Sequence, residues 1–192
     1  MQLQHVNVKL RVADAGEVDL APLIPVFHSW IQERVFGDLL LDVADYRHVP
    51  AGPGVVLIGH EGDYSVDHTD NRLGVRYNRK APLDGSNQDR LQQAARAALS
   101  ACARLEADPR LDGKFRFGGR EIELFINDRL LAPNREETRR AIQPEFDAFF
   151  QKLLRGDRYS LSYGSEPRRL FAVTVQTSQP FSIVDLLANL HS

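Results

Sequence analysis

The feature that most constrains the fold is a strong helix signal over residues 86 to 105. Ser86, followed three residues later by Asp89, forms a variant of the capping box, a pair of side chains that satisfies free backbone amides where a helix begins. Apolar residues then recur at intervals of four and three, and form one narrow seam: Leu91, Ala95, Ala98, Cys102 and Leu105. Because further alanines flank this seam, we predict a long helix that packs closely on a sheet or another helix and ends at Pro109.

Segments that alternate apolar and polar residues predict strands with one buried face. The first runs from Val6 to Val12, and the apolar run from Val55 to Gly59 suits a strand buried on both faces. We expect further strands at residues 39 to 46, 73 to 77, 159 to 163 and 170 to 175. Paired glycines at 118 and 119 predict a tight hairpin that joins strands at 114 to 117 and 121 to 126.

Three further helices are predicted from apolar residues at helical spacing. The first covers residues 20 to 35, although Pro25 leaves its starting point uncertain. Asn134 and Glu137 make a second capping signature, so we expect a helix to begin there, with a kink at Pro144. A short helix over residues 181 to 190 closes the chain.

These elements predict an α+β fold in one globular domain, residues 1 to 192. We expect a mostly antiparallel sheet with three long helices and a short C-terminal helix packed on it. A β-α-β-β order occurs in residues 6 to 59 and again in residues 122 to 175, with an offset of 119 between the matched helix positions. Internal duplication of this unit is therefore an alternative to chance similarity.

Composition is that of an ordinary globular protein, with 43% hydrophobic and 26% charged residues. The single cysteine, Cys102, cannot form an intramolecular disulfide, and its apolar flanks indicate a core residue. The first residues lack the basic and apolar regions of a secretory signal, and no window approaches 18 continuous apolar residues. We therefore expect a cytoplasmic protein with no membrane association. A pI near 6.3 disfavours nucleic-acid binding.

Charge is uneven along the chain. Residues 1 to 71 contain 4 Lys/Arg and 11 Asp/Glu, a net charge of −7, whereas residues 72 to 104 contain 7 Lys/Arg and 2 Asp/Glu, a net charge of +5. Such an asymmetry marks a recognition surface in some proteins. The simpler interpretation is that the acidic and basic segments pair with each other within one domain.

No strong sequence motif indicates a catalytic activity. The chain contains no phosphate-binding loop, nucleophile elbow, zinc-protease motif or paired cysteines, so we expect no cofactor and no metal. The weak catalytic candidates are His60, Glu61, His68 and Asp70, which lie in one polar stretch between two strands. Two histidines and a carboxylate can bind a metal ion, but a solvated hairpin tip explains the same composition.

A second weak signal lies at the start of the long helix. Tyr77, Arg79 and Lys80 come just before a helix N-terminus that begins at Ser86 and Asn87, and free amides with nearby cations attract phosphate or carboxylate. These five residues are the ligand-binding candidates. Alternatively, they form a structural connection in which the helix cap is already satisfied.

Two hypotheses follow. The first is a binding or scaffold protein without catalytic activity, which forms a homodimer or binds a protein partner. The second is an enzyme that acts on a small anionic substrate with polar groups from residues 60 to 90. It requires two segments, residues 60 to 71 and 79 to 89, to face one cleft, and it requires Arg79 and Lys80 to be free of acidic neighbours.

Overall fold

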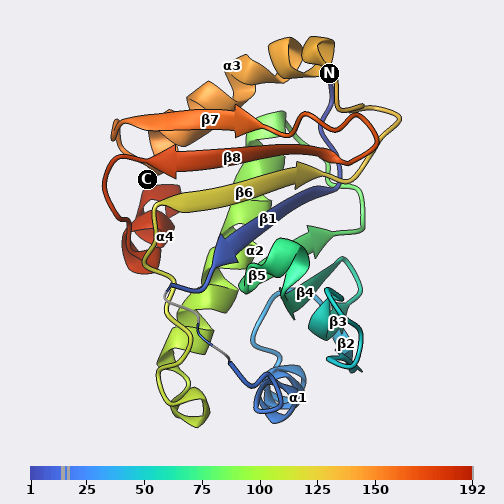
Figure 1. The fold of residues 1–192 in the computed structure, drawn as a ribbon, viewed down its shortest axis with the longest axis vertical. Helices are drawn as coiled ribbons and strands as arrows, with labels where there is room; N and C mark the ends of the chain where they lie inside the picture. The colour runs from blue at the N-terminus through green and yellow to red at the C-terminus, as the bar shows by residue number, and fades with distance from the viewer. Residues whose placement is uncertain (14–15, 17, 192) are drawn as a thin grey trace.

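The computed structural model describes residues 1–13, 16 and 18–191, and their strands form one antiparallel sheet (Figure 1). The strand order is β2-β3-β4-β5-β1-β6-β8-β7, so β2 and β7 are the edges. The strands are β1 (Val6–Arg11), β2 (Leu40–Tyr46), β3 (Gly54–Gly59), β4 (Gly62–Asp67), β5 (Gly74–Arg79), β6 (Glu121–Ile126), β7 (Tyr159–Tyr163) and β8 (Phe171–Thr177).

The helices pack on one face of this sheet, as the predicted α+β fold requires. They are α1 (Leu23–Glu33), α2 (Asn87–Ala107), α3 (Glu136–Leu153) and α4 (Ile183–His191). In Figure 1, α2 crosses behind the sheet, where it contacts β1 and β5, while α1 packs on β2 and β3. Helix α4 rests on α2 and α3. Within the described residues, no helix has both the length and the apolar composition needed to cross a bilayer.

Side-chain alternation explains why only one face is covered. Residues that lie opposite one another in neighbouring strands point to the same face, and one such row is almost entirely apolar or aromatic. It consists of Tyr64, Tyr77, Val8, Leu124, Val173 and Tyr163. These side chains meet the helices and belong to one continuous hydrophobic core. The opposite face, which we call the open face, is turned toward the viewer in Figure 1.

The predicted long helix is confirmed. Ser86 Oγ accepts a hydrogen bond from the Asp89 backbone amide at 3.2 Å, and the Ser86 amide donates to the Asp89 carboxylate at 2.7 Å. All five residues of the seam are buried, and they include Cys102. In α1 the proline at position 25 lies in the first turn, where its missing N–H has no partner to lose.

The predicted hairpin at residues 114 to 126 is wrong. Residues 121 to 126 form β6, but residues 114 to 117 form no strand, although Phe115 and Phe117 are buried. The reason is that β6 already pairs with β1 on one side and β8 on the other, so no edge is left for a hairpin partner. The segment is held irregularly instead, and the Phe117 amide donates to Glu106 Oε1 at 2.7 Å.

The polar stretch after β3 is a solvated turn only at its two ends, residues 60–61 and 68–71. Six of its residues form β4, in which Tyr64 and Val66 face the core. The alternating polar residues of β4 face the open side of the sheet, where charged partners surround Asp67. The sequence-based interpretation missed this strand because its polar residues outnumber its apolar ones.

The second capping signature is also misplaced. Helix α3 begins at Glu136 with Arg135 as its cap residue, and Asn134 lies outside the helix. Its side chain contacts a distant loop instead, where the Asn134 amide donates to the Glu166 carbonyl at 2.8 Å.

Internal duplication is not confirmed by the sheet topology. In the second half, β6 lies directly beside β8. In the first half, the corresponding strands β1 and β3 are separated by β4 and β5. The two halves therefore share an order of elements but not an arrangement in the sheet.

Candidate functional site

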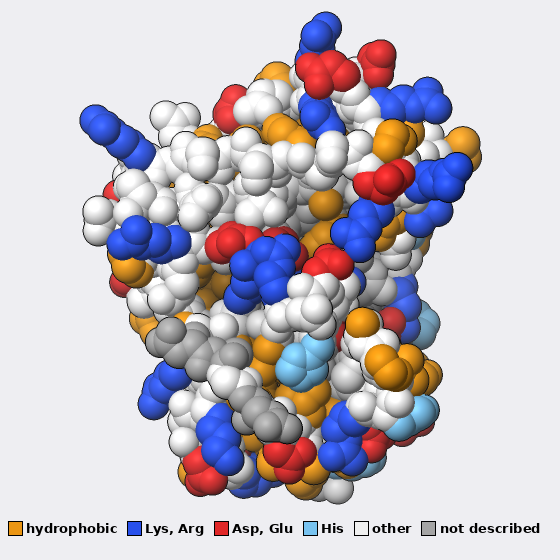
Figure 2. Space-filling model, viewed as in Figure 1, with side chains coloured by type: hydrophobic (Ala, Val, Ile, Leu, Met, Phe, Trp, Pro, Cys, Tyr) orange, Lys and Arg blue, Asp and Glu red, His pale blue; other side chains and the backbone are white. Residues whose placement is uncertain are grey.

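A row of polar side chains crosses the open face. The antiparallel register places residues from six neighbouring strands side by side: Ser65, Arg76, Lys9, Glu123, Thr174 and Ser162. Arg11 lies two positions from Lys9 on β1, and Glu121 lies two positions from Glu123 on β6. Both side chains extend this polar row. Figure 2 shows Lys/Arg and Asp/Glu side chains gathered at the centre of this face. A face with this composition is suited to polar recognition.

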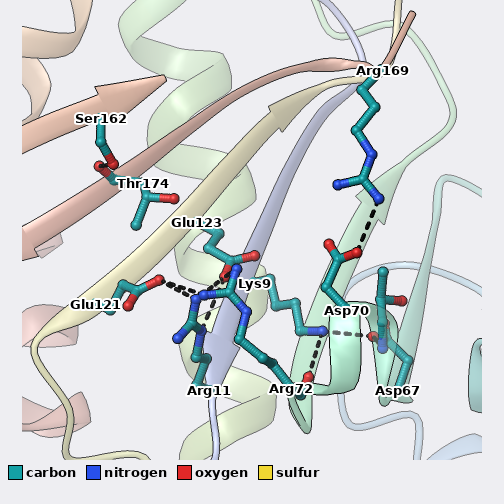
Figure 3. A network of polar contacts seen from close by, with 11 residues as sticks. Lys9, Arg11, Asp67, Asp70, Arg72, Glu121, Glu123, Ser162, Arg169 and Thr174 are labelled. Atoms are coloured by element: carbon teal, nitrogen blue, oxygen red, sulfur yellow. Dashed lines mark hydrogen bonds and ion pairs between the residues drawn. The ribbon is translucent and has the colours of Figure 1, made fainter. Parts of the chain in front are cut away.

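At the centre of the row, Lys9 and Asp67 form a buried ion pair. The Lys9 Nζ lies 2.6 Å from Asp67 Oδ1, and it also donates to the Arg72 carbonyl at 2.9 Å (Figure 3). A Cβ atom on Gly74 would lie 2.8 Å from the Lys9 Cε, so glycine leaves the space that this side chain fills. Burial raises the pKa of Asp67, but Lys9 and Arg76 lower it by more, so the carboxylate stays charged.

Beside this pair, two arginines neutralise two glutamates. Arg11 pairs with Glu121 and, at 2.6 Å, with Glu123, and the Arg72 Nη2 lies 2.9 Å from the Glu123 carboxylate. Burial raises the pKa of Glu121, the charge of Arg11 opposes that rise, and the neighbouring Glu123 adds to it. These four side chains therefore satisfy one another and leave little charge for a ligand.

Arg76 differs from the other cations of the row. Its guanidinium carbon lies 4.7 Å from the centre of the Phe125 ring, and its nearest carboxylate oxygen, on Asp67, is 3.8 Å from Nε. The side chain is only 23% exposed. Among the described residues the guanidinium donates no hydrogen bond, and its Nε is both buried and unpartnered. A planar cation thus rests against an aromatic ring, and its Nη donors make no hydrogen bond within the described residues.

Arg76 and Phe125 line a groove of about 570 Å³, which we call the Arg76 groove. Its other walls come from the connections that precede β5, α3 and β8, and from β8 itself. Arg129 and Arg168 lie there, and their side chains make no ion pair or hydrogen bond within the described part of the chain. Counting all lining residues, five arginines face three carboxylates, so the groove has a net positive charge.

Asn134 contributes a polar group that lacks a partner. It lines the Arg76 groove with 5% exposure, and its Oδ1 is buried and accepts no hydrogen bond from any described residue. An unsatisfied buried acceptor costs about 1–3 kcal/mol. A donor on a bound molecule, reached by a small rotation of the amide, would offset that cost.

The four catalytic candidates are not brought together. His60 and His68 lie beyond opposite ends of β4, whose six residues span about 20 Å at ~3.3 Å per residue. Glu61 pairs with Arg79 at 2.6 Å, and Asp70 pairs with Arg169 at 3.0 Å on the edge of the Arg76 groove. Within the described residues, no group of three His, Cys, Asp or Glu side chains is placed to hold a metal ion.

The cationic candidates have acidic partners close by. The Arg79 guanidinium bonds to Glu61 and to two backbone carbonyls, and the Lys80 Nζ lies 2.7 Å from the Asp63 carboxylate. The condition that the anionic-substrate hypothesis placed on Arg79 and Lys80 is therefore not met. The alternative, pairing of the acidic and basic segments within the domain, is confirmed for these two cations by their contacts with Glu61 and Asp63.

The remaining ligand-binding candidates also have local partners. Ser86 is engaged in the helix cap, and Asn87 Oδ1 accepts a hydrogen bond from the Leu3 amide at 2.8 Å. The hydroxyl of Tyr77 accepts a hydrogen bond from Gln93 at 3.0 Å, in a second hollow on the helix side of the sheet. Of these candidates, Tyr77 and Arg79 line a cavity, and Ser86 and Asn87 do not.

The chain matches no family model, no curated protein and no solved structure. Functional inference therefore rests on the geometry of the open face and of its groove.

Proposed function

We propose that the protein binds a small anionic molecule in the Arg76 groove and does so without changing it chemically. The ligand carries a carboxylate or a phosphate, which Arg76 binds through two parallel hydrogen bonds. Its remaining part carries a hydrogen-bond donor for Asn134. This proposal keeps the hypothesis of a binding protein and moves the anion site from Arg79 and Lys80 to Arg76 on the open face.

The state of Arg76 is the observation that carries the proposal. A guanidinium is always charged, and its fork of donors matches the two oxygens of a carboxylate or phosphate. Four neighbouring cations, Lys9, Arg11, Arg72 and Arg169, are each paired with a carboxylate at 3.0 Å or less, but Arg76 has only a 3.8 Å contact of its own. Because the guanidinium already rests against the Phe125 ring, less side-chain freedom is lost when an anion binds.

The rim of the groove supports the same ligand class. Arg129 and Arg168 add positive charge without local partners, which favours the approach of an anion. Among the described residues, no histidine or cysteine lines the groove, and the lining carboxylate Glu123 is paired with Arg72. Such a lining suits binding better than proton transfer or nucleophilic chemistry.

Thermal-shift titrations with citrate, AMP and glucose 6-phosphate test the proposal. A ligand at 100 times its Kd stabilises the folded chain by about 2.7 kcal/mol, which raises Tm measurably. We expect at least one of these anions to bind, and Arg76→Met to weaken it about 10- to 100-fold, since hydrogen bonds to a charged group contribute about 1.5–3 kcal/mol. Methionine keeps an apolar side chain against Phe125.

Arg158→Met is the matched control, because Arg158 is exposed and its side chain makes no contact with the groove. It removes the same charge and should leave affinity unchanged. The proposal fails if none of the three anions binds, or if both substitutions weaken binding equally.

A homodimer is a second proposal, supported by the distribution of exposed apolar side chains. Four of the largest lie within or just beside the edge strand β2: Leu39, Leu41, Tyr46 and Val49. An edge strand with exposed apolar residues pairs readily with another copy. Sedimentation velocity should give a dimer that Leu41→Lys dissociates, whereas a monomer at 100 µM would exclude it. We further propose a cytoplasmic location, with which one buried cysteine per chain agrees.

A further inference from the structure

A second hollow lies on the helix side of the sheet and shares no residue with the Arg76 groove. Its volume is about 580 Å³, and its walls are the connection between α1 and β2, the core face of β4 and β5, and one side of α2. On α2 the lining residues include Gln93, Ala97 and Ser100, which recur at helical spacing. Because Ala97 and Ser100 are small, this side of the helix leaves open space.

Each charged group of this pocket already has a partner among the described residues, including Arg96, whose Nη2 donates to the Leu190 carbonyl at 3.2 Å and whose Nε is buried without an acceptor. Asp38 accepts hydrogen bonds from the amides of Glu61 and Gly62 at 3.1 Å. Glu61 pairs with Arg79, and Asp89 is held in the cap of α2. A charged ligand would therefore have to displace a bond that the fold itself uses.

Two tyrosines and one glutamine keep unused hydrogen-bonding groups in this pocket. Tyr64 is 3% exposed, and its hydroxyl makes no hydrogen bond with any described residue. Tyr77 accepts a hydrogen bond from Gln93 but donates its own proton to no described acceptor, and the Gln93 Oε1 is buried without a donor. Burial raises the pKa of both tyrosines, so both hydroxyls remain protonated donors at neutral pH.

The shape of the pocket depends on an aromatic stack and on one glycine. The rings of Phe36 and Tyr64 stack with their centres 4.7 Å apart, and Tyr64 in turn contacts Tyr77 at 5.0 Å. A Cβ atom on Gly62 would lie 2.6 Å from the Tyr77 hydroxyl, so any side chain there would push that hydroxyl aside. Both tyrosines are thus fixed beside the hollow.

We propose that this pocket binds a second small molecule that is uncharged and offers both hydrogen-bond donors and acceptors on a ring. Nucleosides and monosaccharides share this chemistry, and both fit the volume. The inference is independent of the anion site, because the two tyrosines face the helices whereas Arg76 faces the open side.

Matched pairs of neutral and phosphorylated compounds test this proposal. Adenosine with AMP, and glucose with glucose 6-phosphate, are titrated into the full chain by isothermal calorimetry. We expect adenosine or glucose to bind at this pocket, and its affinity to fall roughly tenfold in Tyr64→Phe, which removes one hydroxyl and keeps the ring. Arg76→Met is the control and should leave this binding unchanged. Comparing the binding of adenosine with that of glucose shows whether the pocket accepts a nucleoside or a monosaccharide.

The outcomes separate this inference from the proposed function. Two results together support both sites. Binding of the phosphate-bearing compounds is lost only in Arg76→Met, and binding of the neutral compound is lost only in Tyr64→Phe. Failure of adenosine and glucose to bind at 10 mM overturns the inference and leaves the anion site standing. Neutral binding that Tyr64→Phe does not weaken, in a variant that melts like the parent, also overturns it. Ser100→Leu, which fills the pocket from α2, must abolish the binding as well.

Discussion

The Lys9 Nζ and the Asp67 Oδ1 lie 2.6 Å apart on the open face, with 1% and 2% of their side chains exposed. Removing one member of a buried pair leaves the other charge without compensation, and such changes cost about 3–5 kcal/mol. We expect Lys9→Met to lower the free energy of unfolding by up to this amount, because Asp67 then keeps Arg76, at 3.8 Å, as its cationic neighbour. Urea denaturation followed by circular dichroism measures the change.

The double variant Lys9→Met with Asp67→Asn serves as the control, because it removes both charges at once. It should recover a substantial part of the loss, since no uncompensated charge remains buried. A single variant that costs less than about 1 kcal/mol would show that the pair behaves like an exposed one.

The same pair predicts a loss of stability in acid. The pKa of Asp67 is lower in the folded chain than its ordinary value of 3.8, because Lys9 and Arg76 outweigh the effect of burial. A carboxylate whose folded pKa is depressed stabilises the fold above its unfolded pKa, and the contribution disappears as pH falls through the folded value. We therefore expect the free energy of unfolding to drop below about pH 4.

Comparing the parent with Asp67→Asn at pH 7 and pH 3 isolates this contribution from those of other carboxylates. The variant should be less stable than the parent at pH 7, and the difference should shrink at pH 3. An unchanged difference would mean that Asp67 is not charged in the folded chain at neutral pH.

The elements that local pattern determines were predicted well. The α2 seam and its Ser86 cap depend on residues within one or two turns of each other, so the sequence states them directly. Strands β1, β2, β7 and β8 were also found within a few residues. The predicted strand at 114 to 117 failed because β6 has a partner on each side, and pairing of that kind is set by tertiary structure.

The candidate site was harder to predict from the sequence, because its residues are distant from one another in the chain. Arg76, Phe125 and Asn134 come from three different elements, and Asn134 looked like a helix cap in sequence. One signal was present: the alternation of Asn7, Lys9 and Arg11 with apolar residues places charge on the face away from the core. Sequence alone cannot tell which cationic side chains have acidic partners in the folded chain. From the sequence we therefore selected Arg79 and Lys80, which are paired in the structure, and did not select Arg76.

The cap of α2 gives a prediction of defined size. Ser86→Ala removes the oxygen that accepts from the Asp89 amide, and losses of this kind cost about 1 kcal/mol. Ser178→Ala is a suitable control, since Ser178 is exposed and its hydroxyl makes no bond within the described residues. Urea denaturation of the two variants should separate them by about that amount, and equal midpoints would rule out a stabilising cap.

The thiol of Cys102 should be unreactive until the chain unfolds. Burial raises its pKa well above the ordinary value, nearby Glu106 adds to this, and only the thiolate attacks disulfide reagents. We expect Ellman's reagent to label no cysteine in the native chain over minutes at pH 8, and one per chain at once in 6 M guanidinium chloride. Leu91→Ala, which opens a cavity on the same buried seam of α2, should accelerate native labelling, because it destabilises the core by about 2–5 kcal/mol and raises the population of open forms. Rapid labelling of the native parent would place Cys102 at the surface, and would contradict the packing of α2 against the sheet.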